Sequence, residues 1–261
     1  MKLAVVIPAF NEVRSIRSVA ERALGCAPLV IVVDDGSTDG TADALAGLPV
    51  VLVRHEHNRG KAAALWSGFD AALADGADYV GTLDGDGQHD PADLRRLAAA
   101  AQLHPGTMIV GARLLDRPCA PFSRRVANRI ADFWVSWAAG YPIADSQSGE
   151  RLYPVALLRA VEAPHDRGTS FTFESEVLIR GARLGYTSVA VPIRTIYEGS
   201  ARASHFRPAR DITRIVLMVA RALLASGMNP AGLWNSLRLR PIVVERAAPD
   251  AAEYQTSGDA D

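Results

Sequence analysis

The chain has 261 residues, a formal net charge of −1, 49% hydrophobic residues and 22% charged residues. This length is enough to bury a single core, and the composition excludes a wholly disordered protein. The near-neutral total excludes a dedicated nucleic-acid-binding protein, because such proteins are usually basic overall. Two cysteines, Cys26 and Cys119, are too few for a disulfide scaffold or a cysteine-rich metal site, so we expect a reducing, cytoplasmic compartment.

The first half of the chain alternates strand-length apolar runs with helical patterns. The predicted strands are 3–7, 29–33, 50–53, 79–83 and 108–110, and the predicted helices are 13–24, 41–46, 61–74 and 91–101. This alternation predicts an α/β fold with a buried, mostly parallel sheet flanked by helices. Ligands bind at the carboxyl ends of the strands in such sheets, so the polar loops that follow these strands are expected to form one site.

The second half is less regular. It contains predicted helices at 123–139, 174–185, 208–226 and 235–240, a predicted strand at 188–193, and a polar tail from residue 247 that we expect to be disordered. No stretch reaches the roughly 18 apolar residues of a membrane span. The apolar run near the first residue is too short for a signal peptide.

Two aspartates flank a glycine directly after the predicted strand 79–83. Asp84 and Asp86 supply the carboxylate oxygens that Mg²⁺ or Mn²⁺ prefers, and such an ion keeps positions open for a diphosphate. Gln88 and His89 are close enough to add a ligand or an outer-shell hydrogen bond. An ordinary Asp-Gly turn with solvated acids explains the segment equally well when it is taken alone.

Two other loops open helices with residues suited to a nucleotide. Segment 34–41 delivers Asp35 from a buried strand, where its carboxylate can accept hydrogen bonds from a nucleobase or a ribose. Segment 58–61 places Gly60 and Lys61 at a helix start, which suits a phosphate, although the spacing is not that of a P-loop. Helix capping in the first segment and a plain helix start in the second are the simpler alternatives.

Together these segments resemble a known family. Val6-Ile7-Pro8-Ala9-Phe10-Asn11-Glu12 comes first, and segments 34–41, 58–61 and 84–91 follow in order and at the expected separations. The set is similar to family 2 glycosyltransferases of the GT-A fold, in the branch of dolichyl-phosphate mannose synthase and related polyprenyl-phosphate sugar transferases. The resemblance is specific over residues 3–93 and extends more loosely to about residue 215.

The resemblance implies a donor site and a metal site. Binding of the nucleotide-diphosphate sugar would involve Pro8, Phe10, Glu12, Asp35, Lys61, Asp84 and Gly85. Phe10 stands where the family often has tyrosine. A Mg²⁺ or Mn²⁺ ion that bridges the donor diphosphate would be held by Asp84, Asp86 and Gln88.

The resemblance also implies a catalytic set and an acceptor site. Segment 145–151 is similar to the family's Asp-x-x-x-Gly-Phe-Arg pattern beside the acceptor, with Glu150 in place of the phenylalanine. The implied catalytic residues are Asp86, Asp145, Arg113, Arg124 and Arg151. Either Arg124 or Arg125 matches a second phosphate-binding arginine of the family. The acceptor phosphate would meet Arg125, Ser204, His205 and Arg207.

The nature of the acceptor can be argued from its chemistry. An alcohol needs a general base, whereas an ionised phosphate needs only positioning and charge compensation. Several arginines without an obvious base therefore favour a phosphate, and the Gln-x-x-Arg-Trp motif of processive relatives is absent from the sequence. The alternative is transfer to a hydroxyl of a glycan or glycolipid, with Asp145 as the base.

Two other functional classes fit less well. A nucleotidyltransferase normally carries a glycine-rich activation loop near its N-terminus, and segment 8–12 contains no glycine. A nucleotide-sugar-binding protein without activity would not need the Asp84–Asp86 pair.

The predicted helix 208–226 is amphipathic. If the helical spacing is extended by one residue to 207, four arginines lie in one arc of the helix and five apolar residues lie opposite. The arginines are Arg207, Arg210, Arg214 and Arg221, and the apolar residues are Ile212, Ile215, Val216, Val219 and Leu223. This arrangement predicts a helix at the membrane interface, and a helix packed on the core with a solvated arginine face fits equally well. We divide the chain into a GT-A domain at 1–205, amphipathic interfacial helices at 206–246 and a disordered tail at 247–261.

The sequence thus predicts a metal-dependent, inverting glycosyltransferase that moves a sugar from a nucleotide-diphosphate donor to a polyprenyl phosphate. We expect it to be peripheral on the cytoplasmic face of the membrane, to work with a membrane protein partner and to bind no nucleic acid. The net charge hides two opposed regions, because residues 34–93 sum to −9 and residues 201–240 sum to +6.

Overall fold

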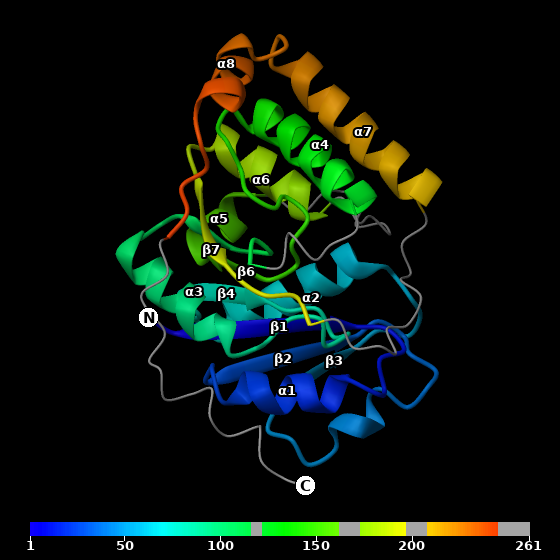
Figure 1. Cartoon of the computed structure of the whole chain (residues 1–261). Coiled ribbons are helices and arrows are strands. Elements are labelled where there is room, and N and C mark those ends of the chain that lie inside the picture. Colours follow the sequence, from blue (N-terminus) through cyan, green and yellow to red (C-terminus); the bar gives the residue numbers. More distant parts are fainter. Residues whose placement is uncertain (116–121, 162–172, 197–207, 245–261) are drawn as a thin grey trace, which may run out of the picture.

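A single mixed sheet organises the fold (Figure 1). The computed structural model describes residues 1–115, 122–161, 173–196 and 208–244. Its seven strands lie in the order β3-β2-β1-β4-β6-β5-β7. They are β1 (Leu3–Ala9), β2 (Leu29–Asp34), β3 (Val51–Arg54), β4 (Tyr79–Thr82), β5 (Met108–Ala112), β6 (Arg151–Pro154) and β7 (Ser188–Pro192). Neighbouring strands run parallel except that β6 is antiparallel to both β4 and β5.

Helices cover both faces of the sheet. One face packs on α1 (Ile16–Leu24) and α3 (Asp93–Leu103), and the other on α2 (Lys61–Ala74), α5 (Val155–Ala160) and α6 (Phe173–Arg183). Side chains alternate between the two faces along β1, because Val5 belongs to the core with α1 and α3, and Val6 belongs to the core with α2, α5 and α6. Gly68 lets α2 lie close on β1, since a Cβ there would be 2.3 Å from Val6 Cγ1.

An outer layer of three helices lies on the α6 side. Its members are α4 (Phe122–Ala139), α7 (Pro208–Ala225) and α8 (Pro230–Arg238), and Figure 1 shows α7 running beside α4. Val219 and Leu223 of α7 are buried in the core that also contains α2 and α6, so much of the predicted apolar arc packs on the protein. Val216, Leu217 and Leu224 stay exposed on another side of α7. No helix in the described part of the chain is long and apolar enough to cross a membrane.

Most predicted elements are present, with local differences. Helix α1 begins three residues after the predicted start at 13, because Asn11 has a left-handed φ of 57° and a turn precedes the helix. The predicted helix 41–46 is a 3₁₀ turn at Asp43–Leu45. Helix α8 begins earlier than predicted, because the Asn229 side chain caps it by accepting from Gly232 N. Strand β6 and helix α5 had not been predicted.

Candidate active site

Three loops meet at the carboxyl ends of β1, β2 and β4, as the sequence predicted. The first two loops are tied together, since Thr38 N donates to Asn11 Oδ1 at 2.9 Å and Glu12 N donates to Thr41 Oγ1 at 2.8 Å. The loop after β4 joins them through Ser15 Oγ, which donates to Gly85 O at 2.7 Å. These hydrogen bonds join the loops after β1, β2 and β4 into one polar surface at one edge of the sheet.

Asp35 organises the start of α2. Its carboxylate accepts from Arg59 N at 2.9 Å and from Gly60 N at 2.7 Å, and its Oδ1 lies 2.6 Å from His55 Nδ1. The residue is buried and shapes the turn that presents Lys61. Its predicted contact with a nucleobase or ribose stays a prediction. Sequence reasoning missed His55, which has no signal beyond its place at the end of β3.

Lys61 bridges two carboxylates. Its Nζ lies 2.6 Å from Asp84 Oδ1 and 2.7 Å from Glu174 Oε1 at the first turn of α6. Burial lowers the pKa of Lys61, but the charges of Asp84 and Glu174 outweigh it and raise that pKa above its ordinary value. Glu174 is a site residue that the sequence did not reveal, because an acid in the first turn of a helix looks like a partner of the helix dipole.

The turn after β4 carries the predicted metal ligands. Asp86 is exposed and its Oδ1 accepts from Gln88 N at 3.0 Å. Burial raises the pKa of Asp84, but Lys61 outweighs it and holds that pKa below its ordinary value. Desolvation and the nearby charge of Asp84 raise the pKa of Asp86. A cation between the two would relieve this repulsion, so the pair fits a hard divalent ion that also takes oxygen ligands from a substrate.

The described residues contain no cluster of three or more histidine, cysteine or acidic side chains arranged to hold a metal ion. The residues present therefore fit an ion that takes only part of its ligands from the protein. These ligands would be the carboxylates of Asp84 and Asp86 and the amide of Gln88. Gly149 closes one side of it, because a Cβ there would be 2.4 Å from Asp84 Oδ2. The backbone of segment 145–150 thus lies directly against the acidic turn.

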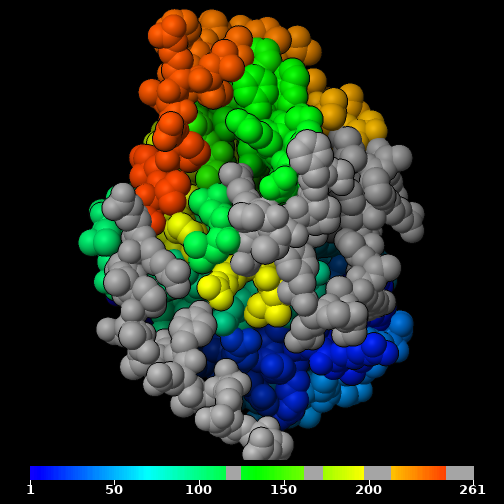
Figure 2. All heavy atoms as spheres, viewed as in Figure 1, coloured from blue at the N-terminus to red at the C-terminus, as the bar shows by residue number. Residues whose placement is uncertain are grey.

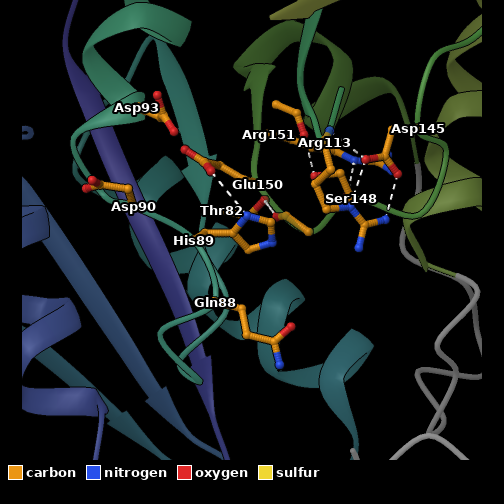
Figure 3. A network of polar contacts seen from close by, with 12 residues as sticks. Thr82, Gln88, His89, Asp90, Asp93, Arg113, Asp145, Ser148, Glu150 and Arg151 are labelled. Carbon is orange, nitrogen blue, oxygen red and sulfur yellow. Dashed lines mark hydrogen bonds and ion pairs between the residues drawn. The ribbon is translucent and has the colours of Figure 1, made fainter. Parts of the chain in front are cut away.

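Arg113 and Asp145 form a second charged pair beside this turn (Figure 3). Arg113 Nε and Nη2 donate to the two carboxylate oxygens at 2.8 and 2.7 Å, and Arg113 N donates to Oδ2 at 2.8 Å. Burial raises the pKa of Asp145, but the hydrogen bonds and charge of Arg113 outweigh it and lower that pKa. Asp145 is consequently a poor general base.

Arg151 is bonded to the backbone around the site. Its side chain is fully buried, and it donates to three backbone carbonyls, those of Ser146 at 2.8 Å, Ser148 at 2.8 Å and Glu174 at 2.6 Å. The side chain has no exposed surface in this structure, and its predicted catalytic role stays a prediction. Arg151 holds the loop 145–150 and the start of α6 together.

The remaining predicted residues divide into three groups. Pro8, Phe10 and Glu12 are half-buried at the end of β1, where the donor was expected. Arg125 is exposed on α4. The side chain of Arg124 lies outside the described residues, and so do Ser204, His205 and Arg207.

The sequence and fold match proteins of one family. Residues 4–152 match the family described as glycosyl transferase family 2. The chain belongs to that family. The match includes the loops after β1, β2 and β4 and ends inside β6. The chain is therefore a glycosyltransferase, as the resemblance implied.

Named relatives of this family 2 chain act on lipid-linked phosphates. The undecaprenyl-phosphate mannosyltransferase of Micrococcus luteus is 30% identical over 203 residues, which are 74% of this chain and 83% of that protein. The polyprenol monophosphomannose synthase of Mycolicibacterium smegmatis is 31% identical over 200 residues, 72% of this chain and 75% of that one. The branch suggested by the sequence motifs is therefore confirmed.

A solved structure shows the same fold. Glucosyl-3-phosphoglycerate synthase from Mycobacterium tuberculosis, in complex with Mn²⁺, UDP-glucose and phosphoglyceric acid, aligns with a TM-score of 0.61 and 23% identity. The alignment covers 86% of this chain and 79% of that one. The predicted GT-A architecture with a mostly parallel sheet is confirmed.

Proposed function

We propose that this family 2 glycosyltransferase transfers a sugar, with inversion and with the help of Mg²⁺ or Mn²⁺, from a nucleotide-diphosphate sugar to a polyprenyl phosphate. The observation that carries the proposal is the meeting of Lys61, Asp84 and Asp86 beside the Arg113–Asp145 pair. Cations and a metal-binding turn suit a diphosphate leaving group. The relatives with polyprenyl-phosphate acceptors support the choice of acceptor.

The reaction exchanges one phosphate oxygen for another at the sugar. An ionised oxygen of the acceptor phosphate attacks the anomeric carbon, and the bond from that carbon to the donor diphosphate breaks on the opposite face. The electron pair of that bond leaves with the nucleoside diphosphate, and no proton has to move. The protein's task is therefore to compensate negative charge on both sides of the carbon, which is the role of Lys61 and Arg113.

Asp145 favours a phosphate acceptor over an alcohol. A base that removes a hydroxyl proton needs a free lone pair and a pKa near neutrality. Arg113 binds both carboxylate oxygens of Asp145 and lowers its pKa, so the aspartate serves better to aim the guanidinium. Transfer to a hydroxyl with Asp145 as base is the weaker candidate.

The metal ion would bind to Asp84, Asp86 and Gln88 and would offset charge on the donor diphosphate. Mn²⁺ and UDP-glucose in the solved neighbour are consistent with this part of the proposal. The ion pair between Lys61 and Asp84 supports the proposal that positive charge is favourable at this turn.

We also propose that the outer helices rest on the cytoplasmic face of the membrane. Trp134 of α4 is 42% exposed and Trp234 of α8 is 56% exposed, and Figure 2 shows α4 and α8 on one face of the molecule. Arg238 lies over the Trp234 ring at 3.7 Å from its centroid. Among the described side chains of 125–139 and 213–244, the only acid is buried Asp132, against six arginines. Tryptophan and arginine without exposed acids suit an anionic lipid surface.

A transfer assay tests the proposal. Purified protein is incubated with polyprenyl phosphate, Mn²⁺ or Mg²⁺, and in turn GDP-mannose, UDP-glucose and UDP-N-acetylglucosamine. One donor should give a polyprenyl-phosphate sugar, and Asp84→Asn or Asp86→Asn should lower the rate at least about 100-fold, because charge compensation at the diphosphate is lost.

Asp75→Asn is the matched control, since Asp75 forms an exposed ion pair with Lys2 away from the site. Its rate should equal that of the wild type. Transfer to a glycolipid hydroxyl but not to polyprenyl phosphate would overturn the choice of acceptor. Full activity of Asp86→Asn would overturn the role of the metal.

A further inference from the structure

A buried acid lies behind the acidic turn. Glu150 is fully buried at the start of β6, and both of its carboxylate oxygens lack a hydrogen-bond partner among the described residues. The imidazole of His89 lies beside it, with Nδ1 3.4 Å from Glu150 Oε2. Figure 3 shows the carboxyl and the ring facing each other, while Gln88 points away from the pair.

This placement carries a cost that an apolar residue would avoid. A buried carboxyl without a hydrogen bond loses its hydration without compensation. Burial, together with the charges of Asp93 and Asp90, raises the pKa of Glu150 well above its ordinary value. Departures from the rule that buried polar groups are paired occur mainly where function needs them.

His89 links this carboxyl to the metal-binding turn. The imidazole is buried, and among the described residues its Nδ1, like both Glu150 oxygens, has no hydrogen-bond partner; the 3.4 Å approach to Glu150 Oε2 is its polar contact. His89 follows Gln88 directly, and the Gln88 carbonyl accepts from Ile196 N at 2.9 Å. The turn is thus anchored by its backbone on one side and by the His89 ring on the other.

Glu150 is itself rigidly held. Gly111 N donates to the Glu150 carbonyl at 2.9 Å, and the preceding Gly149 carbonyl accepts from Thr82 Oγ1 at 2.7 Å. These bonds attach residues 149 and 150 to β5 and β4, the two strands beside β6. A side chain on such a fixed backbone can orient the group beside it, here the His89 ring.

We infer that Glu150 is a positioning residue that fixes the His89 ring and, through it, the turn Asp84–Gln88 for binding of the divalent cation. The inference rests on the proposed function, because it assigns the turn to the metal. It adds an outer-shell residue that acts without touching the ion or the donor.

The test compares variants of one residue. Glu150→Leu removes the polar partner but keeps the volume, whereas Glu150→Gln keeps a hydrogen-bonding group. Glu150→Leu should raise the Mn²⁺ concentration for half-maximal transfer about 10-fold, with the rate at saturating Mn²⁺ within about twofold of wild type. Glu150→Gln should stay within about threefold in the same Mn²⁺ titration. Direct titration of free Mn²⁺ by electron paramagnetic resonance gives the same comparison without turnover.

A merely structural role would give another pattern. Removal of an unpaired buried carboxyl should not lower the melting temperature of the metal-free protein, although Mn²⁺ binding weakens. A structural role would lower both together. The double variant Glu150→Leu/His89→Leu should bind Mn²⁺ no more weakly than His89→Leu alone, because both substitutions break one connection.

Three outcomes separate the possibilities. Wild-type Mn²⁺ affinity in Glu150→Leu, or effects that add in the double variant, would overturn the inference. If Glu150→Leu does not fold, the His89→Leu variant must show the same weakened Mn²⁺ binding, and normal binding there would overturn the inference. A wild-type enzyme with no dependence on metal would instead overturn the proposed function. Glu21→Leu, which removes an exposed pair with Arg17, is the control.

Discussion

At the scale of single residues, the site is defined by close backbone approach as much as by charge. Gly149 allows segment 145–150 to touch the Asp84 carboxylate, and Gly85 allows the acidic turn to lie against β1, since a Cβ there would be 3.2 Å from Pro8 O. Neither position needs a left-handed backbone, because neither has a positive φ. At both positions an atom of the candidate site occupies the space that a Cβ would need.

We expect Gly149→Ala to impair transfer severely. The new Cβ would lie 2.4 Å from Asp84 Oδ2, so either the carboxylate or β6 must move. A displacement of about 1 Å at a catalytic group can lower the rate about 100-fold, and we expect a loss of that size. Transfer kinetics measure it. Gly25→Ala, at a helix end where the nearest atom would be 3.3 Å away, is the control, and equal losses in both variants would contradict this explanation.

The pH dependence of stability should report on Glu150. Its ordinary pKa is 4.5 and its folded-state pKa is well above this value, so above pH 4.5 the folded chain binds more protons than the unfolded chain. Stability from this group is therefore lost as the pH rises through that interval. Glu150→Gln cannot titrate, so the melting temperature of this variant should rise relative to that of the wild type as the pH rises above 4.5. A constant difference over this range, as expected for the Glu21→Gln control, would argue against a raised pKa.

At the scale of elements, the predictable parts are those with local signals. Helix α2 was predicted with its observed bounds because its apolar run begins after Gly60 and ends before a polar turn. Strand β6 could not be predicted, since Arg-Leu-Tyr-Pro contains a buried arginine and a proline and shows no alternation. Its Arg151 donates to carbonyls of the preceding loop and of α6, and no local pattern encodes the second of these contacts.

The candidate site divides in the same way. The acidic turn and Lys61 were predictable, because their residue types follow strands or open a helix. The partners Glu174 and His55 were not, because they come from α6 and from the residue after β3 and reach the site only through tertiary packing. Likewise, sequence could not reveal that Arg113 occupies both oxygens of Asp145.

The helices α4 and α8 should determine binding to membranes. Trp134 stacks on Trp137 at 5.2 Å between ring centroids, and Trp234 projects from α8 beside Arg238. Each exposed indole that enters the interface should contribute about 1.5 to 3 kcal/mol. We therefore expect Trp134→Ser/Trp234→Ser to weaken sedimentation with phosphatidylglycerol vesicles at least about 10-fold.

The control for this experiment is Leu103→Ser, because Leu103 is 73% exposed at the end of α3, outside the three outer helices. Its vesicle binding should match that of the wild type. Equal weakening by both changes would mean that the membrane contact is not confined to α4 and α8. Neutral phosphatidylcholine vesicles should bind all variants poorly, since the arginines then lack an anionic partner.

At the scale of the whole molecule, opposite charges lie in different parts of the chain. Asp35, Asp84 and Asp86 lie in loops at the carboxyl edge of the sheet, and the arginines of α4, α7 and α8 belong to the outer layer. A donor with its cation and an anionic lipid can therefore be bound by different regions at the same time. The near-neutral net charge of −1 thus conceals two oppositely charged regions of the chain.

The reversed direction of β6 has a consequence for folding. Because β6 is antiparallel, its first residue pairs with the last residue of β4, so Arg151 lies opposite Thr82. The acidic turn is made early during synthesis, but its wall at Gly149 is added only after more than sixty further residues have emerged. Long-range pairing of this kind forms slowly compared with local helices. A nascent chain that has completed β1, β2 and β4 thus has the acids of the site but not the strand that encloses them.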